Sequence, residues 1–201
     1  MKFNFNFTIN VPRWLRQIIL WPVILYYRLR FGQVVRLIHI ANFKFAIVDL
    51  ADYEELRKYP WRLCRSNRTC YAFYTVPRGK NLTQNVFWMH RQIMKPPDWL
   101  LVDHGNHNGL DNRRCNLRLA NHSENKRNTR KQNSKTSSRF KGVDFVKPTG
   151  KWRARISIGH KRLFLGSFTD ELSAARAYDD AAKKYFGEFA CLNFPESADS
   201  G

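Results

Sequence analysis

The clearest alternation of apolar and polar residues lies in the last third of the chain. Between residues 152 and 158 the even positions hold Trp, Ala, Ile and Ile, and the odd positions hold Arg153, Arg155 and Ser157. A period of two is typical of a β-strand, so the segment predicts a strand with one apolar and one cationic face. Trp152 falls on the apolar face, where we expect it in the core.

The same pattern continues into a second strand and then a helix. After a turn, residues 162–166 alternate again, with Arg162 and Phe164 on one side. Thr169 is placed to cap the start of an alanine-rich helix that ends at Gly187. Because alanine side chains are small, we expect this helix to lie close against the sheet.

A different succession of elements precedes this sheet. An apolar strand at 99–102 is followed by a polar loop and a short strand at 117–119. Asn121, with Glu124 three residues later, matches a capping box and predicts a helix that ends near residue 130. The predicted order is strand, loop, strand, helix.

The first half of the chain holds shorter patterns. We expect a helix at 51–59, and strands within 35–48 and at 61–63, 69–76 and 86–90. The apolar stretch 14–27 is interrupted by polar residues and a proline, and it is shorter than the roughly 18 apolar residues that a membrane span needs. A membrane location is therefore not expected, and residues 1–34 are an extension without an assigned role.

The charge of the chain indicates a polyanionic partner. It has 35 Lys and Arg against 16 Asp and Glu, a net charge of +19. From Lys126 to Arg162 thirteen basic residues stand against one acid, a net +12, whereas 163–201 is net −4. This segregation favours a nucleic-acid contact surface, because each phosphate contact releases counterions. Charge alone does not separate this partner from a ribosome or an anionic membrane surface.

The cysteines give no reason to expect structural zinc. Cys64, Cys70, Cys115 and Cys191 contain no C-x-x-C pair and no regular spacing. Reduced thiols are the simplest interpretation, and they agree with a cytoplasmic location.

Four side chains of the strand–loop–strand–helix segment offer the chemistry of phosphodiester hydrolysis. The reaction needs an activated water, stabilisation of charge on the phosphate, and help for the leaving oxygen. A neutral imidazole can supply the first, and a hard cation with oxygen ligands can supply the other two. Asp103 and His104 end the first strand, Asn116 follows the loop, and Asn125 lies on the helix.

These residues and their neighbours resemble the HNH endonucleases of phages and bacteria, including homing types. The resemblance covers about 35–130 and is carried by MHRQIM (89–94), VDH (102–104), NGLDNRR (108–114), NLR (116–118) and EN (124–125). It implies a ββα-metal nuclease core with His104 as the general base. It also implies that Asp103 and Asn125 bind one divalent metal ion, Mg²⁺, and that Asn116 braces the hairpin and orients His104. Asn125 stands where the family also uses His, and an amide oxygen suits a hard cation.

Neighbouring residues compete for two of these roles. Asn128, one helical turn beyond Asn125, is the main alternative metal ligand, and Asn112 is a weaker alternative to Asn116. The candidates for holding backbone phosphates in this segment are Arg113, Arg114 and Arg118.

The segment 138–195 resembles the APETALA-type DNA-binding domain of plant ethylene-response factors. The matching stretches are FKGV (140–143), GKWRA (150–154), LGSF (165–168), AARAYD (174–179) and LNFP (192–195). The resemblance implies a three-stranded antiparallel sheet in the major groove of double-stranded DNA, with one helix packed behind it. The side chains expected at the DNA are Lys141 and Lys147 from the first strand, and Arg153, Arg155, Ser157, Arg162 and Phe164 from the next two.

This chain departs from the plant pattern at three places on the expected DNA face. Asp144 and Val146 stand where basic residues are usual, and Phe164 stands where Trp is usual. The plant target sequence is therefore not carried over, and the bases that are read do not follow from the sequence.

Together these patterns predict an α+β protein in five parts: an extension (1–34), a nuclease domain with a β-rich lead-in (35–130), a basic linker (131–139), a DNA-binding domain (140–195) and a tail (196–201). The expected function is metal-dependent DNA cleavage guided by the C-terminal sheet, without a small-molecule substrate. The protein is expected to be a homing or mobile-element nuclease of a bacterium or phage, cytoplasmic and associated with the nucleoid. The alternative is a catalytically inactive, transcription-factor-like DNA-binding protein. RNA binding is disfavoured because Phe164 is the single aromatic residue expected on the exposed face, whereas stacking platforms use two or three. The oligomeric state does not follow from the sequence.

Overall fold

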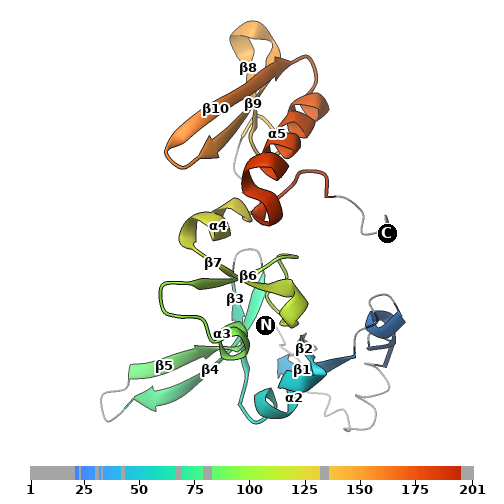
Figure 1. Cartoon of the computed structure of the whole chain (residues 1–201), viewed down its shortest axis with the longest axis vertical. Helices are drawn as coiled ribbons and strands as arrows, with labels where there is room; N and C mark the ends of the chain where they lie inside the picture. Colours follow the sequence, from blue (N-terminus) through green and yellow to red (C-terminus); the bar gives the residue numbers. More distant parts are fainter. Residues whose placement is uncertain are drawn as a thin grey trace, which may run out of the picture. The chain divides into compact units, whose positions relative to one another are not determined.

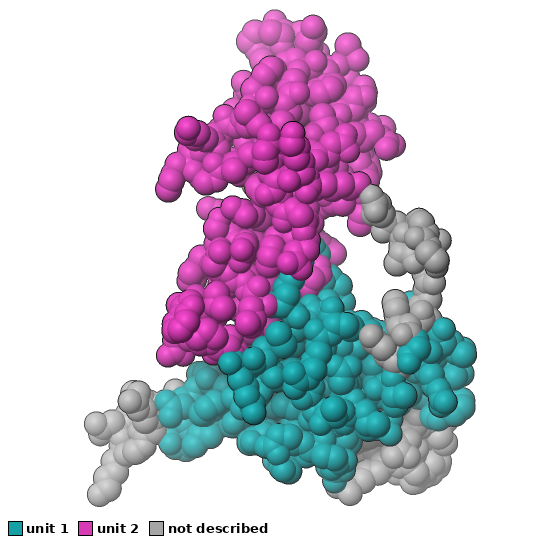
Figure 2. Space-filling view, viewed as in Figure 1, with its two compact units in different colours: residues 1–95, 106–118 teal, residues 96–105, 119–201 magenta. Residues whose placement is uncertain are grey.

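Short antiparallel strands and a few helices make up most of the described chain. The computed structural model describes residues 21–22, 24–29, 32, 34–41, 44–66, 69–78, 83–131 and 136–195. The protein is mixed α+β, as predicted, and its sheets contain two or three strands each (Figure 1). It divides into two compact units, residues 1–95 with 106–118 and residues 96–105 with 119–201 (Figure 2).

Unit 1 contains two small sheets. In the first, β1 (Val35–Ala41) pairs antiparallel with β2 (Lys44–Asp49), and α2 (Leu50–Leu56) follows directly. The second has the order β3-β4-β5 and consists of β3 (Arg62–Arg65), β4 (Cys70–Arg78) and β5 (Thr83–Trp88). The short helix α3 (Met89–Met94) and the 3₁₀ turn η2 (Arg114–Asn116) also belong to this unit.

Apolar and aromatic side chains fill the interior of unit 1. Val35 of β1 and Val48 of β2 are fully buried. The ring of Tyr74 stacks on those of Tyr59 and Phe87, with centroid separations of 4.7 and 4.9 Å. β2 contributes Val48 to this interior.

The hairpin–helix segment consists of β6 (Leu101–His104), β7 (Leu117–Ala120) and α4 (His122–Arg127). β6 and β7 pair as a two-stranded sheet and α4 follows, so the predicted order of strand, loop, strand and helix is confirmed. The boundary between the two units passes through β7: the loop 106–116 belongs to unit 1, and β6 and α4 belong to unit 2.

Residues 136–195 of unit 2 form the sheet domain. Its three antiparallel strands have the order β10-β9-β8. They are β8 (Val143–Val146), β9 (Lys151–Ile158) and β10 (Lys161–Phe168), with the 3₁₀ turn η3 (Lys147–Thr149) between the first two. One long helix, α5 (Glu171–Phe186), packs across the sheet and leads into the 3₁₀ turn η4 (Gly187–Phe189) (Figure 1).

The predicted apolar face of β9 is the one that α5 covers. Ala154 packs against Ala174 and Ala175, and Ile156 belongs to a second buried cluster with Tyr178. The chain passes close to the helix at Gly142, where φ is +77° and a Cβ would lie 1.9 Å from Cδ2 of Tyr178. Only glycine fits this position, because both the backbone angle and the space exclude a side chain.

Several element boundaries differ from the predictions, among them the following three. α5 is capped by Asp170 rather than Thr169, because the Asp170 carboxylate accepts the Ser173 N–H at 2.7 Å. The predicted strand 86–90 ends at Trp88, and α3 begins at residue 89 because Met89 and Ile93 bury one helical face. Finally, α4 ends at Arg127 and not near residue 130.

Several predictions fall on residues outside the described ranges. They include most of the apolar stretch 14–27, residues 132–135 of the linker, and the tail 196–201. In the part of the chain that is described, no helix has the length and apolar character needed to cross a membrane.

Candidate functional site

Two buried polar residues end the short strand β6. Asp103 and His104 are 7% and 5% exposed, while Leu101 and Val102 before them are half-buried. A strand that carries an acid and an imidazole into the interior needs partners for them, because an unpaired buried carboxylate is strongly disfavoured.

The helix α4 begins at a capping box, as the sequence predicts. The Asn121 side chain accepts the Glu124 N–H at 2.9 Å, and the Glu124 carboxylate accepts the Asn121 N–H at 2.8 Å. This cap fixes the start of a helix that is less than two turns long. Asn125 and Asn128 then lie about one turn apart, in and directly after α4, and Asn128 is buried.

Asn128 supplies the partner for Asp103. Its side-chain amide donates to both carboxylate oxygens of Asp103, at 3.0 and 2.8 Å, and lies 3.2 Å from the carbonyl oxygen of His104. The structure therefore brings Asp103, His104 and Asn128 together, with Asn125 half-buried one turn earlier. The prediction that Asn125 rather than Asn128 is a metal ligand is not tested by these contacts.

The donors at this place suit a hard cation. Asp103 has a buried carboxylate, and the half-buried Asn125 of α4 has an amide oxygen. Mg²⁺ is commonly bound by one or two protein oxygen ligands, with water and phosphate oxygens completing its shell. The described residues contain no cluster of three or more His, Cys, Asp and Glu side chains that could hold a metal ion.

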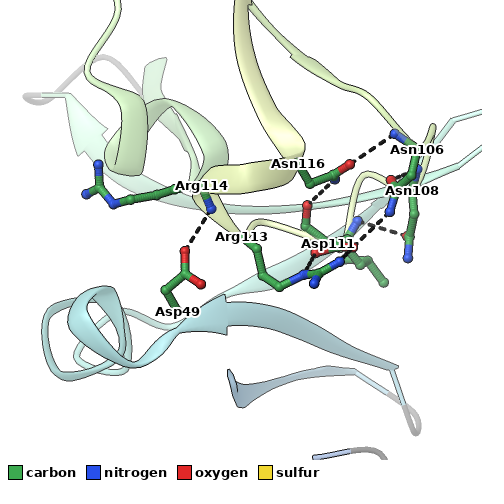
Figure 3. Close-up of polar contacts among 8 residues, drawn as sticks. Asp49, Asn106, Asn108, Asp111, Arg113, Arg114 and Asn116 are labelled. Atoms are coloured by element: carbon green, nitrogen blue, oxygen red, sulfur yellow. Dashed lines mark hydrogen bonds and ion pairs between the residues drawn. The ribbon is translucent and has the colours of Figure 1, made fainter. Parts of the chain in front are cut away.

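In unit 1, Asn116 braces the loop that follows β6 (Figure 3). Its side-chain oxygen accepts the Asn106 N–H at 3.0 Å, and its amide donates to the Asp111 carbonyl at 2.7 Å. Asn116 thus joins the start of the loop to its middle. The role expected of Asn116, bracing the hairpin and orienting His104, stays a prediction, and Asn112, the weaker alternative, is fully buried.

A buried ion pair lies at the centre of the same loop (Figure 3). The Arg113 guanidinium donates to both carboxylate oxygens of Asp111, at 2.8 and 2.7 Å, and the Asn106 amide donates to one of them at 2.8 Å. The hydrogen bonds that Arg113 donates to Asp111 raise the pKa of Arg113 above its usual value, although burial acts against this. The Tyr27 ring lies 4.5 Å from the guanidinium carbon, so the N-terminal extension contributes to this network.

The loop is fastened to the edge of β2. Ile47 donates its N–H to the Leu110 carbonyl and accepts the Asn112 N–H, both at 2.8 Å. Arg114 pairs with Asp52 of α2 through two hydrogen bonds of 2.8 and 2.7 Å. Arg113 and Arg114, which the sequence offered as phosphate contacts, therefore have carboxylate partners in the protein. Their role at phosphates, like that of the half-buried Arg118, stays a prediction.

In unit 2, the predicted DNA-facing side chains of β9 and β10 share one face of the sheet domain. The register pairs Phe164 with Arg155 and Arg162 with Ser157, and directly paired residues point to the same side. Phe164 is 59% exposed, and Ser157 and Arg162 are also exposed. The alternation in the sequence thus located this face correctly.

Asp144 of β8 lies on this face between two arginines. It pairs in register with Arg153. Its carboxylate oxygens accept one bond from Arg153 Nη2 and one from Arg155 Nη2, each 2.7 Å long. The sequence marked Asp144 as a departure from the plant pattern, but the two contacts could not be predicted without the register of β8 and β9.

The sequence suggested that Lys141 and Lys147 lie on the first strand of the sheet, but neither belongs to β8. Lys147 is exposed in η3, beyond the end of β8. Lys141 precedes β8, and its ammonium donates to the carbonyl oxygens of Arg127 and Thr129 at 2.6 and 2.7 Å. A cation at these carbonyls is favourable because they form the negative end of α4. Lys141 thus joins the sheet domain to α4.

Comparison with known proteins finds relatives of two kinds. No family model matches the chain. It is 53% identical over 64 residues to an AP2/ERF and B3 domain-containing protein of Oryza sativa subsp. japonica, covering 32% of this chain and 17% of that protein. It is 41% identical over 63 residues to an AP2/ERF and B3 domain-containing transcription repressor of Arabidopsis thaliana, covering 31% of this chain and 17% of the repressor. The chain therefore spans less than a fifth of the length of these plant relatives.

The second kind of relative covers most of the chain. An uncharacterized HNH endonuclease of Acanthamoeba polyphaga mimivirus is 32% identical over 151 residues, which are 74% of this chain and 74% of the viral protein. Since an alignment of this length cannot fit within the sheet domain alone, the similarity extends into the region that contains β6 and α4.

Proposed function

Because the chain belongs to the HNH endonuclease family, we propose that it is a metal-dependent endonuclease that hydrolyses phosphodiester bonds of double-stranded DNA at sites selected by its sheet domain. The observation that carries the proposal is the buried pair Asp103 and His104 at the end of β6, with the amide of Asn128 on the carboxylate. A buried acid and imidazole held by a polar partner are typical of a catalytic site rather than of a solvated surface.

In this proposal the residues of the hairpin–helix segment have different roles in the reaction. His104, in its neutral form, accepts a proton from the attacking water. Asn128 positions the Asp103 carboxylate through the two hydrogen bonds described above, a supporting role that commonly affects metal affinity. Asp103 and Asn125 would hold one Mg²⁺, which when bound stabilises charge on the phosphate and on the leaving oxygen.

The sheet domain supplies the contact with the target. Arg153, Arg155 and Arg162 present guanidinium groups on one exposed face, and an arginine can bind a guanine edge through two hydrogen bonds. The similarity to plant proteins named for the AP2/ERF domain supports DNA as the partner of this face. A nuclease with its own reading domain suits a homing or mobile element.

The test is nicking of supercoiled plasmid by the full chain in the presence of Mg²⁺. His104→Ala should lower the nicking rate by about 100-fold to 10,000-fold, the range for loss of a general base. His122→Ala is the matched control, since His122 is an exposed histidine at the start of α4. It should nick at the wild-type rate, and EDTA should stop both proteins.

A second candidate is a DNA-binding protein without nuclease activity. The higher identity of the plant relatives, 53% against 32%, favours a retained binding function over the catalytic one. Tight DNA binding without nicking under any divalent metal would support this candidate and overturn the nuclease proposal. Equal nicking by the wild type and His104→Ala would overturn the role of His104.

A further inference from the structure

Asp144 holds two arginines on the exposed face of the sheet domain. Each of its carboxylate oxygens accepts one hydrogen bond of 2.7 Å, from Nη2 of Arg153 and from Nη2 of Arg155. The geometry follows from the register, because Asp144 lies opposite Arg153 and Arg155 is the next residue of β9 on the same face. One acid therefore fixes two neighbouring guanidinium groups.

The contact leaves both arginines able to bind a ligand. A guanidinium has five N–H donors, and each bond to Asp144 uses one of them. The side chains of Arg153 and Arg155 remain 35% and 29% exposed. Partial burial acts to raise the pKa of Asp144, but the hydrogen bonds from the two arginines hold that pKa below its usual value. The carboxylate is thus ionised at neutral pH.

The negative charge of Asp144 and the orientation that it gives to the two arginines have different consequences for DNA binding. A mobile arginine can bind any phosphate, and such contacts are independent of sequence. An oriented guanidinium matches the paired acceptors of a guanine edge, and the nearby carboxylate reduces the attraction to phosphate. An acid in this place therefore lowers binding to arbitrary DNA more than binding to a matching site.

We propose that Asp144 is a positioning residue for sequence recognition, which orients the guanidinium groups of Arg153 and Arg155 toward base edges and weakens their binding to phosphates elsewhere. The inference rests on the proposed contact between this face and double-stranded DNA. It adds an acidic residue to a face whose other predicted contacts are basic, polar or aromatic.

The experiment compares two variants of the full chain that lose the same charge. Asp144→Asn removes the carboxylate between the arginines, and Asp180→Asn removes one from an exposed position on α5. Binding is measured with EDTA present, so that no DNA is cleaved. A pool of duplexes with a randomised centre first yields the sequence that the wild type prefers. The affinities for that duplex and for a scrambled duplex are then measured over a range of salt concentrations.

We expect Asp144→Asn to lower the ratio of the two affinities by about tenfold, mostly by tighter binding to the scrambled duplex. Its salt dependence on that duplex should steepen by about one phosphate contact. Asp180→Asn should change the ratio by less than about twofold. A purely structural role of Asp144 would weaken binding to both duplexes, so a gain on scrambled DNA separates positioning from stability.

Three results would overturn the inference. In the first, Asp144→Asn keeps the wild-type ratio. In the second, both variants change binding alike, which would make the effect one of net charge. In the third, the wild type prefers no sequence, and then the proposed reading of DNA by the sheet domain also fails. Plasmid nicking with Mg²⁺ tests the nuclease part independently of all three.

Discussion

Buried polar side chains are divided unequally between two regions of the molecule. Among the described residues, those in 103–128 are Asp103, His104, Asp111, Asn112, Arg113, Asn116 and Asn128. The sheet domain buries only Ser138 and Asp179 among its described polar and charged residues, and its remaining buried side chains are apolar or aromatic. The two regions are therefore held together by different forces.

The difference separates a region suited to chemistry from a region suited to binding. Apolar burial is tolerant of small changes, because it depends mainly on the area removed from water. A buried polar network is not, since removal of one partner leaves the other without a hydrogen bond. Even the buried acid of the sheet domain, Asp179, has hydrogen-bond partners: it accepts the N–H groups of Asn193 and Phe194, each at 2.8 Å.

The largest effect is expected from breaking the buried ion pair of the loop. Asp111→Asn removes the charge that compensates Arg113, which is 7% exposed, and should lower the free energy of unfolding by about 3–5 kcal/mol. Urea unfolding of the full chain measures this change. The matched control is Asp52→Asn, because Asp52 makes the same two-bond contact with Arg114, which is 55% exposed. Its loss should amount to about 1 kcal/mol or less. Equal losses would mean that burial does not decide the strength of these pairs.

The next prediction distinguishes the role of Asn125, which lies in α4, from that of Asn128, which directly follows it. Asn125→Ala should reduce Mg²⁺-dependent nicking by about 100-fold, which corresponds to about 2.7 kcal/mol, and should raise the Mg²⁺ concentration needed for activity. Asn128→Ala should reduce nicking by about 10-fold to 100-fold through the displaced Asp103 carboxylate. It should also lower the urea midpoint. A higher Mg²⁺ requirement for Asn128→Ala than for Asn125→Ala would exchange the two roles.

A third prediction tests how tightly the apolar region is packed. Gly142→Ala should destabilise the sheet domain by about 2 kcal/mol more than Gly150→Ala. Both glycines have a positive φ, +77° and +63°, but a Cβ at Gly142 would meet Tyr178, whereas at Gly150 it would meet nothing within 4 Å. Thermal unfolding of the two variants isolates the steric part of the effect. Similar melting temperatures would show that α5 can move away from the strand.

The sequence predicted the apolar region better than the polar one, for a physical reason. Alternation over 152–158 identified both faces of β9, because burial of one face imposes a period of two on the residues themselves. The contacts of Asn116 with Asn106 and of Arg114 with Asp52 leave no such periodic trace. They join residues 10 and 62 positions apart, and depend on how the loop folds back on unit 1. The resemblance to HNH endonucleases identified Asn116 as a site residue, but it did not predict the residues that Asn116 contacts.

The helix-capping residues also show which contacts can be predicted from the sequence and which cannot. The box of Asn121 and Glu124 was predictable because both of its hydrogen bonds lie within four consecutive residues. Thr169 and Asp170 are neighbours that can both cap a helix, and only the backbone conformation selects Asp170, with φ −126° and ψ 154°. A local motif is thus predictable to about one residue when two suitable side chains are adjacent.

The smallest expected effect concerns Lys141, which connects the sheet domain to the end of α4. Lys141→Met removes the ammonium that binds the carbonyl oxygens of Arg127 and Thr129 and should lower stability by about 1 kcal/mol. Because the ammonium of Lys141 is hydrogen-bonded at α4, its loss should change DNA affinity by less than about twofold. Lys147 is exposed in η3, so Lys147→Met should reduce the salt dependence of DNA binding by about one phosphate contact.

The positions of the cleaved ends sharpen this last test. With α4 no longer fastened to the sheet domain, Lys141→Met should cut over a wider range of distances from the bound sequence, while Lys147→Met should keep the wild-type positions. Sequencing the ends produced from one duplex containing the preferred site measures both distributions. If Lys141→Met instead loses affinity as Lys147→Met does and cuts at unchanged positions, then Lys141 binds phosphate, as the plant resemblance implied, and the hydrogen bonds to α4 do not set the distance between reading and cutting.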